Sequence, residues 1–323
     1  MIHGQLGPAA AAPFSEQILL AFNGQVDIRA AYTWSRDMII NFLCSVVVSP
    51  VHFGAPVADG AKLADICREI RELSAPVGTE YRSPDARLNP PHHILRKFNP
   101  RWNSQHCRGI SKFKLRKHKH DRIPYWSPTD LLGLFISTPG IAPQGATKRN
   151  FYLPLTAMYG QWCNQLLDTI HKPAMYSCLW VPGADKFFLG ASLGGCVLKD
   201  NLVGSWPLPV KRGRYWLVGG DPVTLSGWSF NKKPEIYQTI GNCAETYPIV
   251  HLLRNGLDVN NQNVHGLALR KKALKAAQYE DTLSGNFWTR VADPCENCEF
   301  LIELHGGDLQ NFYRFAGSAG APA

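Results

Sequence analysis

The apolar positions in the first part of the chain recur at helical spacing. Residues 15–48 predict one or two helices, and residues 61–74 (AKLADICREIRELS) repeat apolar side chains at the spacing of another. Pro50 and Pro76 follow these segments, and proline cannot continue a helix. A further helix is predicted within residues 155–172.

Short apolar segments between Gly and Pro residues follow this last helix and are typical of strands. They are residues 176–181 (YSCLWV), 186–191 (KFFLGA), 214–220 (RYWLVGG) and 223–230 (VTLSGWSF).

Toward the C-terminus the pattern alternates. Residues 243–255 predict a helix, residues 256–280 form a polar and basic insertion, residues 286–292 resemble a strand, and a helix starts at Pro294. One more strand is expected within residues 309–315. Strands that alternate with helices predict an α/β fold, in which functional sites gather at strand ends and helix N-termini.

The chain is predicted to divide near residue 150. Residues 137–150 (STPGIAPQGATKRN) collect Pro, Gly and Thr between apolar segments, as linkers do. Residues 81–126 are rich in Pro, Asn and basic residues and show little periodicity. We therefore expect a mostly helical and irregular N-terminal module over 1–150 and an α/β domain over 151–323.

Composition narrows the class of protein. Hydrophobic residues make up 45% of the 323 positions, enough to bury a sizeable core. Nine cysteines are an odd number in a chain too long for a disulfide scaffold, which favours reduced thiols. The N-terminus lacks the pattern of a secretion signal, and the longest apolar run, residues 38–48, is shorter than the roughly 20 residues of a membrane helix. A soluble cytoplasmic or nuclear protein without a membrane partner is expected.

The net charge of +9 is concentrated in one segment. Residues 92–122 hold ten of the 34 Lys and Arg residues and a single acidic residue, Asp121, so the rest of the chain is balanced. Phe98, Trp102 and Phe113 lie between these basic residues, a combination that stacks bases and neutralises phosphates. The segment predicts a nucleic-acid partner; a solvated loop or a localisation signal is the alternative. It also contains four potential metal ligands, at a spacing that matches no zinc finger: His106, Cys107, His118 and His120.

Three cysteines form the clearest chemical pattern. Cys295 and Cys298 are three positions apart at a predicted helix start, where their side chains face the same side, and Cys243 begins another predicted helix. Pro294 suits the first helical position because its missing N–H needs no partner there. The positive ends of both helix dipoles stabilise thiolates. Three protein ligands with a fourth position left for water are typical of a catalytic zinc site.

Glu245 follows the first of these cysteines by two positions. We expect it to reach a water on the metal without being a ligand, and to act as the general base that shuttles the proton. Three thiolates make such a site negative, so a compensating cation is expected, with Arg254 and Arg290 as candidates.

The motifs Cys243-Ala244-Glu245 and Pro294-Cys295-Glu296-Asn297-Cys298 match the two signatures of zinc deaminases. Their surroundings, GNCAETYPIVHLL and ADPCENCEFLIEL, resemble the cytidine deaminase-like superfamily, including the toxin-type nucleic-acid deaminases of bacteria and fungi. The resemblance covers roughly residues 210–305 and implies a mixed β-sheet sandwiched by helices, with Zn²⁺ as cofactor. It also implies hydrolytic loss of ammonia from cytosine or adenine, and a cysteine as first ligand favours cytosine-to-uracil conversion.

The sequence departs from the free-cytidine enzymes of this family. Those enzymes bind the ribose with an Asn-x-Glu pair before the first motif, whereas Asn231 and Glu235 are here four positions apart. The insertion between the motifs carries Arg270, Lys271, Lys272 and Lys275, which suits a phosphate backbone better than a nucleoside. DNA or RNA is therefore the expected substrate, and free cytidine the alternative. The expected substrate contacts are Asn231, Trp228, Phe230, Arg270, Lys271 and Lys272. For Trp228 and Phe230, packing in the hydrophobic core is the alternative.

A serine hydrolase is the rival interpretation. Residues 190–194 (GASLG) fit Gly-x-Ser-x-Gly around Ser192, and Asp258 or Asp293 followed by His305 keeps the hydrolase order. No HGGG-like oxyanion loop precedes the motif, and a tight turn between two strands is the alternative. A core that is stabilised by a structural zinc, or that holds no metal, is the other alternative to catalysis. Three further cysteines lie in apolar surroundings and are expected to pack in the core: Cys163, Cys178 and Cys196.

Overall fold

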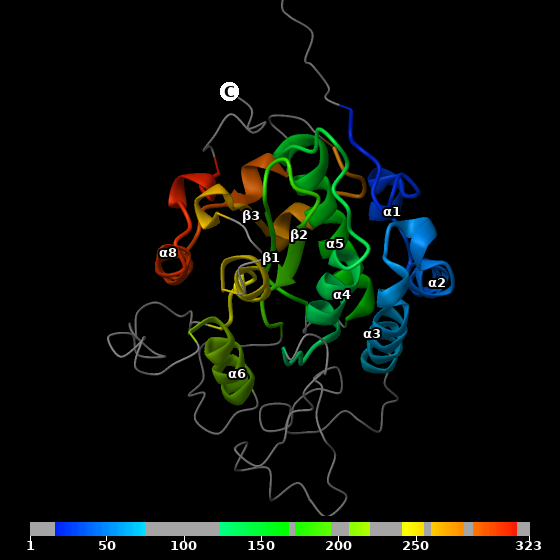
Figure 1. The fold of residues 1–323 in the computed structure, drawn as a ribbon, viewed down its shortest axis with the longest axis horizontal. Helices are drawn as coiled ribbons and strands as arrows, with labels where there is room; N and C mark the ends of the chain where they lie inside the picture. Colours follow the sequence, from blue (N-terminus) through cyan, green and yellow to red (C-terminus); the bar gives the residue numbers. More distant parts are fainter. Residues whose placement is uncertain are drawn as a thin grey trace, which may run out of the picture.

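A four-stranded sheet lies at the centre of the described part of the chain (Figure 1). The computed structural model describes residues 17–74, 123–167, 172–194, 207–219, 241–254, 260–280 and 287–314. The strands are β1 (Met175–Trp180), β2 (Phe187–Ala191), β3 (His265–Arg270) and β4 (Val291–Ala292), in the spatial order β2-β1-β3-β4. Every pairing among these strands is antiparallel. The resemblance implies a mixed sheet, with parallel pairs as well; the described strands contain none, and the mixed sheet stays a prediction.

Strand β1 is buried on both faces. All its residues from Tyr176 to Trp180 are buried, and Cys178 pairs with Leu189 of β2 and with Leu267 of β3. A continuous apolar run, rather than an alternating one, is what a strand covered on both faces requires. Strands β1 and β2 confirm the two strands predicted over residues 176–181 and 186–191, each to within one residue at either end.

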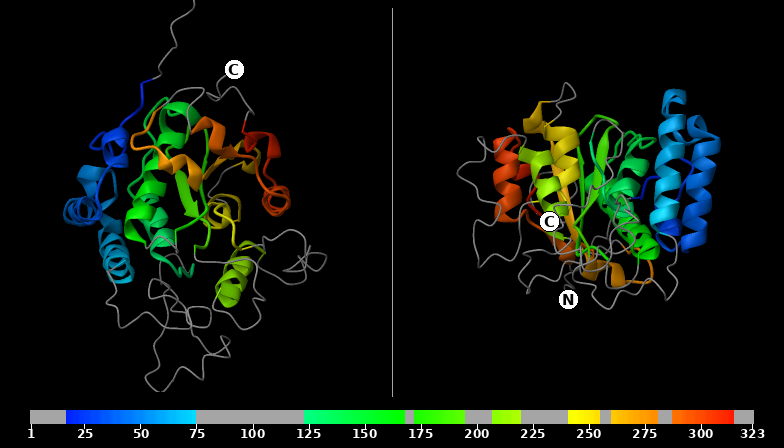
Figure 2. Two further views of the ribbon diagram at one scale, coloured as in Figure 1. Left: turned by 180° about the vertical axis from the view of Figure 1, so that it is seen from behind. Right: turned by 90° about the horizontal axis from the view of Figure 1, so that it is seen from below.

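Helices cover both faces of the sheet (Figure 2). On one face lie α4 (Pro128–Ser137) and α5 (Leu153–Leu166), and on the other α7 (Thr246–Ile249) with α8 (Glu296–Leu304) beyond it. A π-helical turn, Val250–Arg254, continues α7, and another, Lys148–Tyr152, leads into α5. Helix α6 (Pro207–Gly219) packs on α7.

The N-terminal helices form an outer layer against α4 and α5 (Figure 2). They are α1 (Ile28–Tyr32), α2 (Arg36–Val48) and α3 (Gly60–Leu73). Asp27 and Ser35 cap the first two, because their side chains accept hydrogen bonds from free backbone N–H groups of the first turn. The buried residues of α3 recur at helical spacing, which confirms the helix predicted there: Leu63, Ile66, Cys67, Ile70 and Leu73.

The outer layer shares one hydrophobic core with the sheet. The indole N–H of Trp162 on α5 donates to the carbonyl of Ala31 over 2.8 Å, and the Tyr32 hydroxyl donates to the carbonyl of Ala276 over 2.9 Å. Residues 137–150, the expected linker, run from the end of α4 into the π-helical turn before α5. The division of the chain into modules near residue 150 stays a prediction.

Four segments differ from the sequence-based expectation. Residues 214–220 were expected as a strand, but 214–219 lie in α6, because Val210, Arg214 and Val218 are buried at four-residue spacing. Residues 256–280 hold β3, a central strand that a short apolar stretch among basic residues concealed. In the strand expected over residues 286–292, the 3-10 turn Trp288–Arg290 precedes the two-residue strand β4. In the strand expected within residues 309–315, the 3-10 turn Leu309–Asn311 forms instead. Residues 223–230 lie outside the described part.

The described cysteines are all free thiols. Cys163 and Cys178 are fully buried, which confirms their predicted place in the core, whereas Cys196 lies outside the described residues. Among the described helices, none combines the length and the apolar composition that a membrane span requires.

Candidate metal centre

The three predicted cysteine ligands come together in the structure. The Sγ of Cys295 lies 3.8 Å from the Sγ of Cys243 and 3.7 Å from the Sγ of Cys298. All three sulfurs lie within 4.8 Å of one another, so they form a group that can hold a metal ion. A tetrahedral zinc ion with Zn–S bonds of about 2.3 Å has sulfur–sulfur edges of about 3.8 Å. The two edges that Cys295 makes therefore have the length that a zinc ion requires.

Local backbone structure explains this convergence. Cys295 is the N-cap of α8, its carbonyl accepts the backbone N–H of Cys298 over 2.7 Å, and both side chains therefore lie at the first turn. Pro294 precedes the N-cap and is not the first helical residue, so the helix begins two residues later than predicted, at Glu296. Cys243 lies in the turn before α7, which begins at Thr246. Both motifs thus meet at helix N-termini.

The thiols interact electrostatically. Hydrogen bonds from Cys243 and Cys298 lower the pKa of Cys295 to about 3. The pKa values of Cys243 and Cys298 are raised, chiefly because their protons are shared within the cluster. The arrangement therefore favours one thiolate flanked by two thiols, and a divalent cation binding here would displace the two remaining protons.

Glu245 lies beside the cysteine cluster. Its side chain is almost completely buried, and the Cys298 thiol donates to its Oε2 over 3.3 Å. Burial, and next the negative charge of Cys295, raise the pKa of Glu245 to about 7. A carboxyl group with this pKa both accepts and releases a proton near neutrality, as general acid–base catalysis requires.

A small cavity adjoins Glu245 on the side of the sheet. Its volume is about 10 Å³, and its lining includes Ser177, Leu179, Ala268 and Pro294. That volume holds about one water molecule. The Ser177 hydroxyl is buried and has no hydrogen-bond partner in the described part of the chain. A water molecule in this cavity would be within reach of the Ser177 hydroxyl and the Glu245 carboxylate. The apolar sequence of β1 gives no indication that Ser177 lies beside Glu245.

The cation next to the first motif is Arg214, which sequence reasoning missed. Its guanidinium donates to the carbonyl of Cys243 over 3.0 Å and to that of Gly241 over 2.6 Å. Of the expected cations, Arg254 donates instead to the carbonyl of Trp216, and Arg290 is exposed in the 3-10 turn before β4. The strand-like composition of residues 214–220 gives no sign of a buried guanidinium that binds distant carbonyls.

The Ser192 motif is used structurally. The Ser192 hydroxyl is buried and accepts the backbone N–H groups of Ala174 and Met175 over 2.9 and 3.1 Å. His305 donates its Nε2–H to the carbonyl of Val218 over 2.7 Å. These hydrogen bonds engage both groups with the backbone, an arrangement that favours the turn interpretation over a nucleophile.

Gly190 allows the first motif to lie close to the sheet. A Cβ at this position of β2 would overlap the carbonyl oxygen of Ala244 and the ring of Pro248. The glycine therefore has a packing reason that is independent of any hydrolase motif.

The predicted substrate contacts are described only in part. Arg270 ends β3, and Lys271 and Lys272 follow in a 3-10 turn, Lys271–Lys275. Burial, and next the charge of Lys172, lower the pKa of Lys271. The other expected contacts, Asn231, Trp228 and Phe230, lie outside the described residues. Asp258 and the basic segment 92–122 lie outside them as well.

A chain of hydrogen bonds places the basic residues at the end of the sheet nearest the first motif. The Lys271 N–H donates to the carbonyl of Ala174, whose own N–H donates to Ser192. The next residue, Leu193, donates its N–H to the carbonyl of Asn242, which precedes Cys243. We call the group Lys172, Arg270, Lys271, Lys272 and Lys275 the basic end of the sheet.

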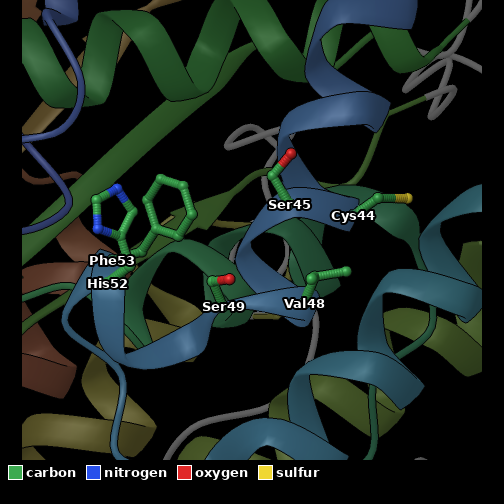
Figure 3. Close-up of a pocket in the computed structure, with 6 residues that line it drawn as sticks. All are labelled: Cys44, Ser45, Val48, Ser49, His52 and Phe53. Atoms are coloured by element: carbon green, nitrogen blue, oxygen red, sulfur yellow. The ribbon is translucent and has the colours of Figure 1, made fainter.

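A second hollow lies on the outer helical layer (Figure 3), and its helix, α2, is on the side of the molecule opposite to α8 (Figure 1). Its volume is about 430 Å³, and residues at the end of α2 and in the 3-10 turn Pro50–Phe53 line it. Figure 3 shows the Cys44 thiol and the His52 ring on opposite sides of the hollow, so they do not form a ligand pair.

Comparisons of this chain with protein-family models, with curated proteins and with solved structures find no match. The function is therefore inferred from the geometry of the site.

Proposed function

We propose that this chain is a zinc-dependent hydrolytic deaminase that converts cytosine to uracil in DNA or RNA. The observation that carries the proposal is the meeting of three cysteine sulfurs at zinc spacing with a buried carboxylate 3.3 Å from one of them. A structural zinc site is closed by four protein ligands, whereas the described residues bring together three. The two motifs that supply these groups match the deaminase signatures.

The roles of the residues follow from their positions. Cys243, Cys295 and Cys298 would hold the metal, which when bound supplies Lewis-acid activation of a water molecule. Glu245 would take a proton at its carboxylate and return it to the departing amine. Its burial excludes bulk water from this proton transfer.

A polynucleotide substrate is favoured by charge. The basic end of the sheet gathers four residues of the insertion with Lys172, at the sheet end that is linked to the first motif. Clustered amines and guanidinium groups bind phosphates, whereas a free nucleoside offers none. The target base would have to be unstacked or single-stranded to reach a buried carboxylate.

The test is incubation of the zinc-loaded protein with single-stranded DNA, double-stranded DNA, RNA and free cytidine, followed by measurement of uracil or uridine. Uracil in a polynucleotide, absent with Glu245→Gln, is the expected result. Uridine from free cytidine alone would reject the polynucleotide. No product from any of the four, with zinc bound, would reject the deaminase.

A further inference from the structure

One guanidinium links three separate segments around the first motif. Arg214 lies on α6 and is fully buried. Its Nε–H donates to the carbonyl of Gly241 over 2.6 Å, and its Nη2 donates to the carbonyls of Ala191 and Cys243 over 2.9 and 3.0 Å. The end of β2 and the segment 241–243 are therefore fixed relative to α6 by a single side chain.

Asp130 on α4 fixes the guanidinium in turn. Its two carboxylate oxygens accept from Nη1 of Arg214 over 2.7 and 2.8 Å, and its side chain is only 1% exposed. The ring of Tyr247 lies 5.0 Å from the guanidinium carbon, a distance typical of a cation–π contact. Carboxylate, ring and carbonyls together leave the guanidinium one orientation.

Only arginine provides this set of contacts. A planar guanidinium has five donors in a fixed arrangement, and here it makes five hydrogen bonds to four residues. A lysine ammonium has three donors on one nitrogen, so it cannot serve Asp130 and three carbonyls together.

We propose that Arg214, held by Asp130, is a positioning residue of the metal centre. It contacts the backbone of Cys243 and not its sulfur, so it acts by fixing where that ligand and Glu245, two residues on, stand relative to Cys295 and Cys298. The inference rests on the proposed metal site but not on any particular substrate. Loss of such outer contacts typically weakens metal binding 10- to 100-fold.

The test is the zinc affinity of folded Arg214→Lys, measured by competition with a chromophoric chelator. The control is Leu63→Ala, which removes a fully buried side chain of α3 on the outer layer (Figure 1). We expect the dissociation constant to rise about tenfold or more for Arg214→Lys, and to stay within about twofold for the control. Cobalt bound to Arg214→Lys should also lose the intensity of its tetrahedral d–d absorption bands.

A second variant tests the inference if Arg214→Lys does not fold. Asp130→Glu keeps both charges but shifts the guanidinium by about one methylene, so a several-fold weaker zinc affinity is expected. Native affinity and native cobalt spectra in a folded variant would overturn the inference. Equal loss of affinity in Leu63→Ala, or failure of both Arg214 and Asp130 variants to fold with zinc present, would overturn it as well, because the pair would then serve the fold as a whole. Absence of zinc binding by the unaltered protein would instead reject the metal site itself.

Discussion

The thiol of Cys298 donates a hydrogen bond to Oε2 of Glu245 across 3.3 Å. The two residues are 53 positions apart and come from different helix starts, so the fold alone brings a candidate metal ligand into contact with a buried carboxyl group. A ligand next to a buried carboxylate is the arrangement that separates metal binding from proton transfer. The two functions can therefore be removed one at a time.

Replacement of Cys298 by serine should abolish stoichiometric zinc binding. A serine hydroxyl is a far weaker zinc ligand than a thiolate, and two remaining cysteines do not hold the ion. Metal analysis of the purified variant should give less than about half an equivalent, against about one for the unaltered chain. Cys44→Ser is the matched control, because Cys44 lies on the outer layer (Figure 3) and should leave the zinc content unchanged. Equal zinc in both variants would contradict the ligand assignment.

Replacement of Glu245 by glutamine should leave zinc bound and remove activity. The amide is nearly isosteric but does not accept the proton, and loss of a general acid–base group costs about 10²- to 10⁴-fold in rate. The measurements are zinc content and the single-turnover rate of uracil formation. A variant that keeps both zinc and more than about a tenth of the rate would show that another group transfers the proton.

The sequence predicts the cysteine cluster better than its surroundings. The structure brings Cys243, Cys295 and Cys298 together, with Glu245 beside them, as the two short motifs led us to expect, because ligand chemistry restricts residue type and spacing tightly. Arg214 escaped detection because its role depends on carbonyls of residues up to 29 positions away, which no local pattern records.

The fold was predictable where burial is continuous or regularly periodic. Helix α3 and strands β1 and β2 show such patterns, and the structure confirms them. The sequence-based prediction was wrong for α6 because its aromatic residues are typical of strands. It missed β3 because only four consecutive residues of this strand are buried. In both cases tertiary packing decided against local propensity.

Replacement of Gly190 by alanine should weaken both the fold and the metal site. The new methyl group would overlap the Ala244 carbonyl and the Pro248 ring, so the segment that carries Cys243 must move off β2. Overpacking of this kind costs about 1–3 kcal/mol. Urea unfolding and zinc competition should both report the change. Gly60→Ala is the matched control, since its nearest neighbour is 3.8 Å away and ordinary contact results; unchanged zinc affinity in Gly190→Ala would show that the motif tolerates displacement.

Acidification should destabilise the fold partly through His305. Burial, and to a lesser extent the charge of Arg254, lower the pKa of His305 in the folded chain. The unfolded chain then binds a proton near the ordinary histidine pKa of about 6.5, whereas the folded chain binds it only at lower pH. Stability contributed by neutral His305 is therefore full above about pH 6.5 and is lost as the pH falls toward the folded pKa.

The measurement is urea unfolding of the zinc-free protein and of His305→Gln between pH 7.5 and pH 5. Glutamine stays neutral and keeps a donor for the Val218 carbonyl, so the variant should lose less stability on acidification. The difference in slope must stay below about 1.4 kcal/mol per pH unit, the limit for one proton. Glu245, whose raised pKa acts in the opposite direction, is present in both proteins, so its contribution cancels in the comparison. Parallel stability curves would show that His305 takes up its proton as readily in the folded chain as in the unfolded one.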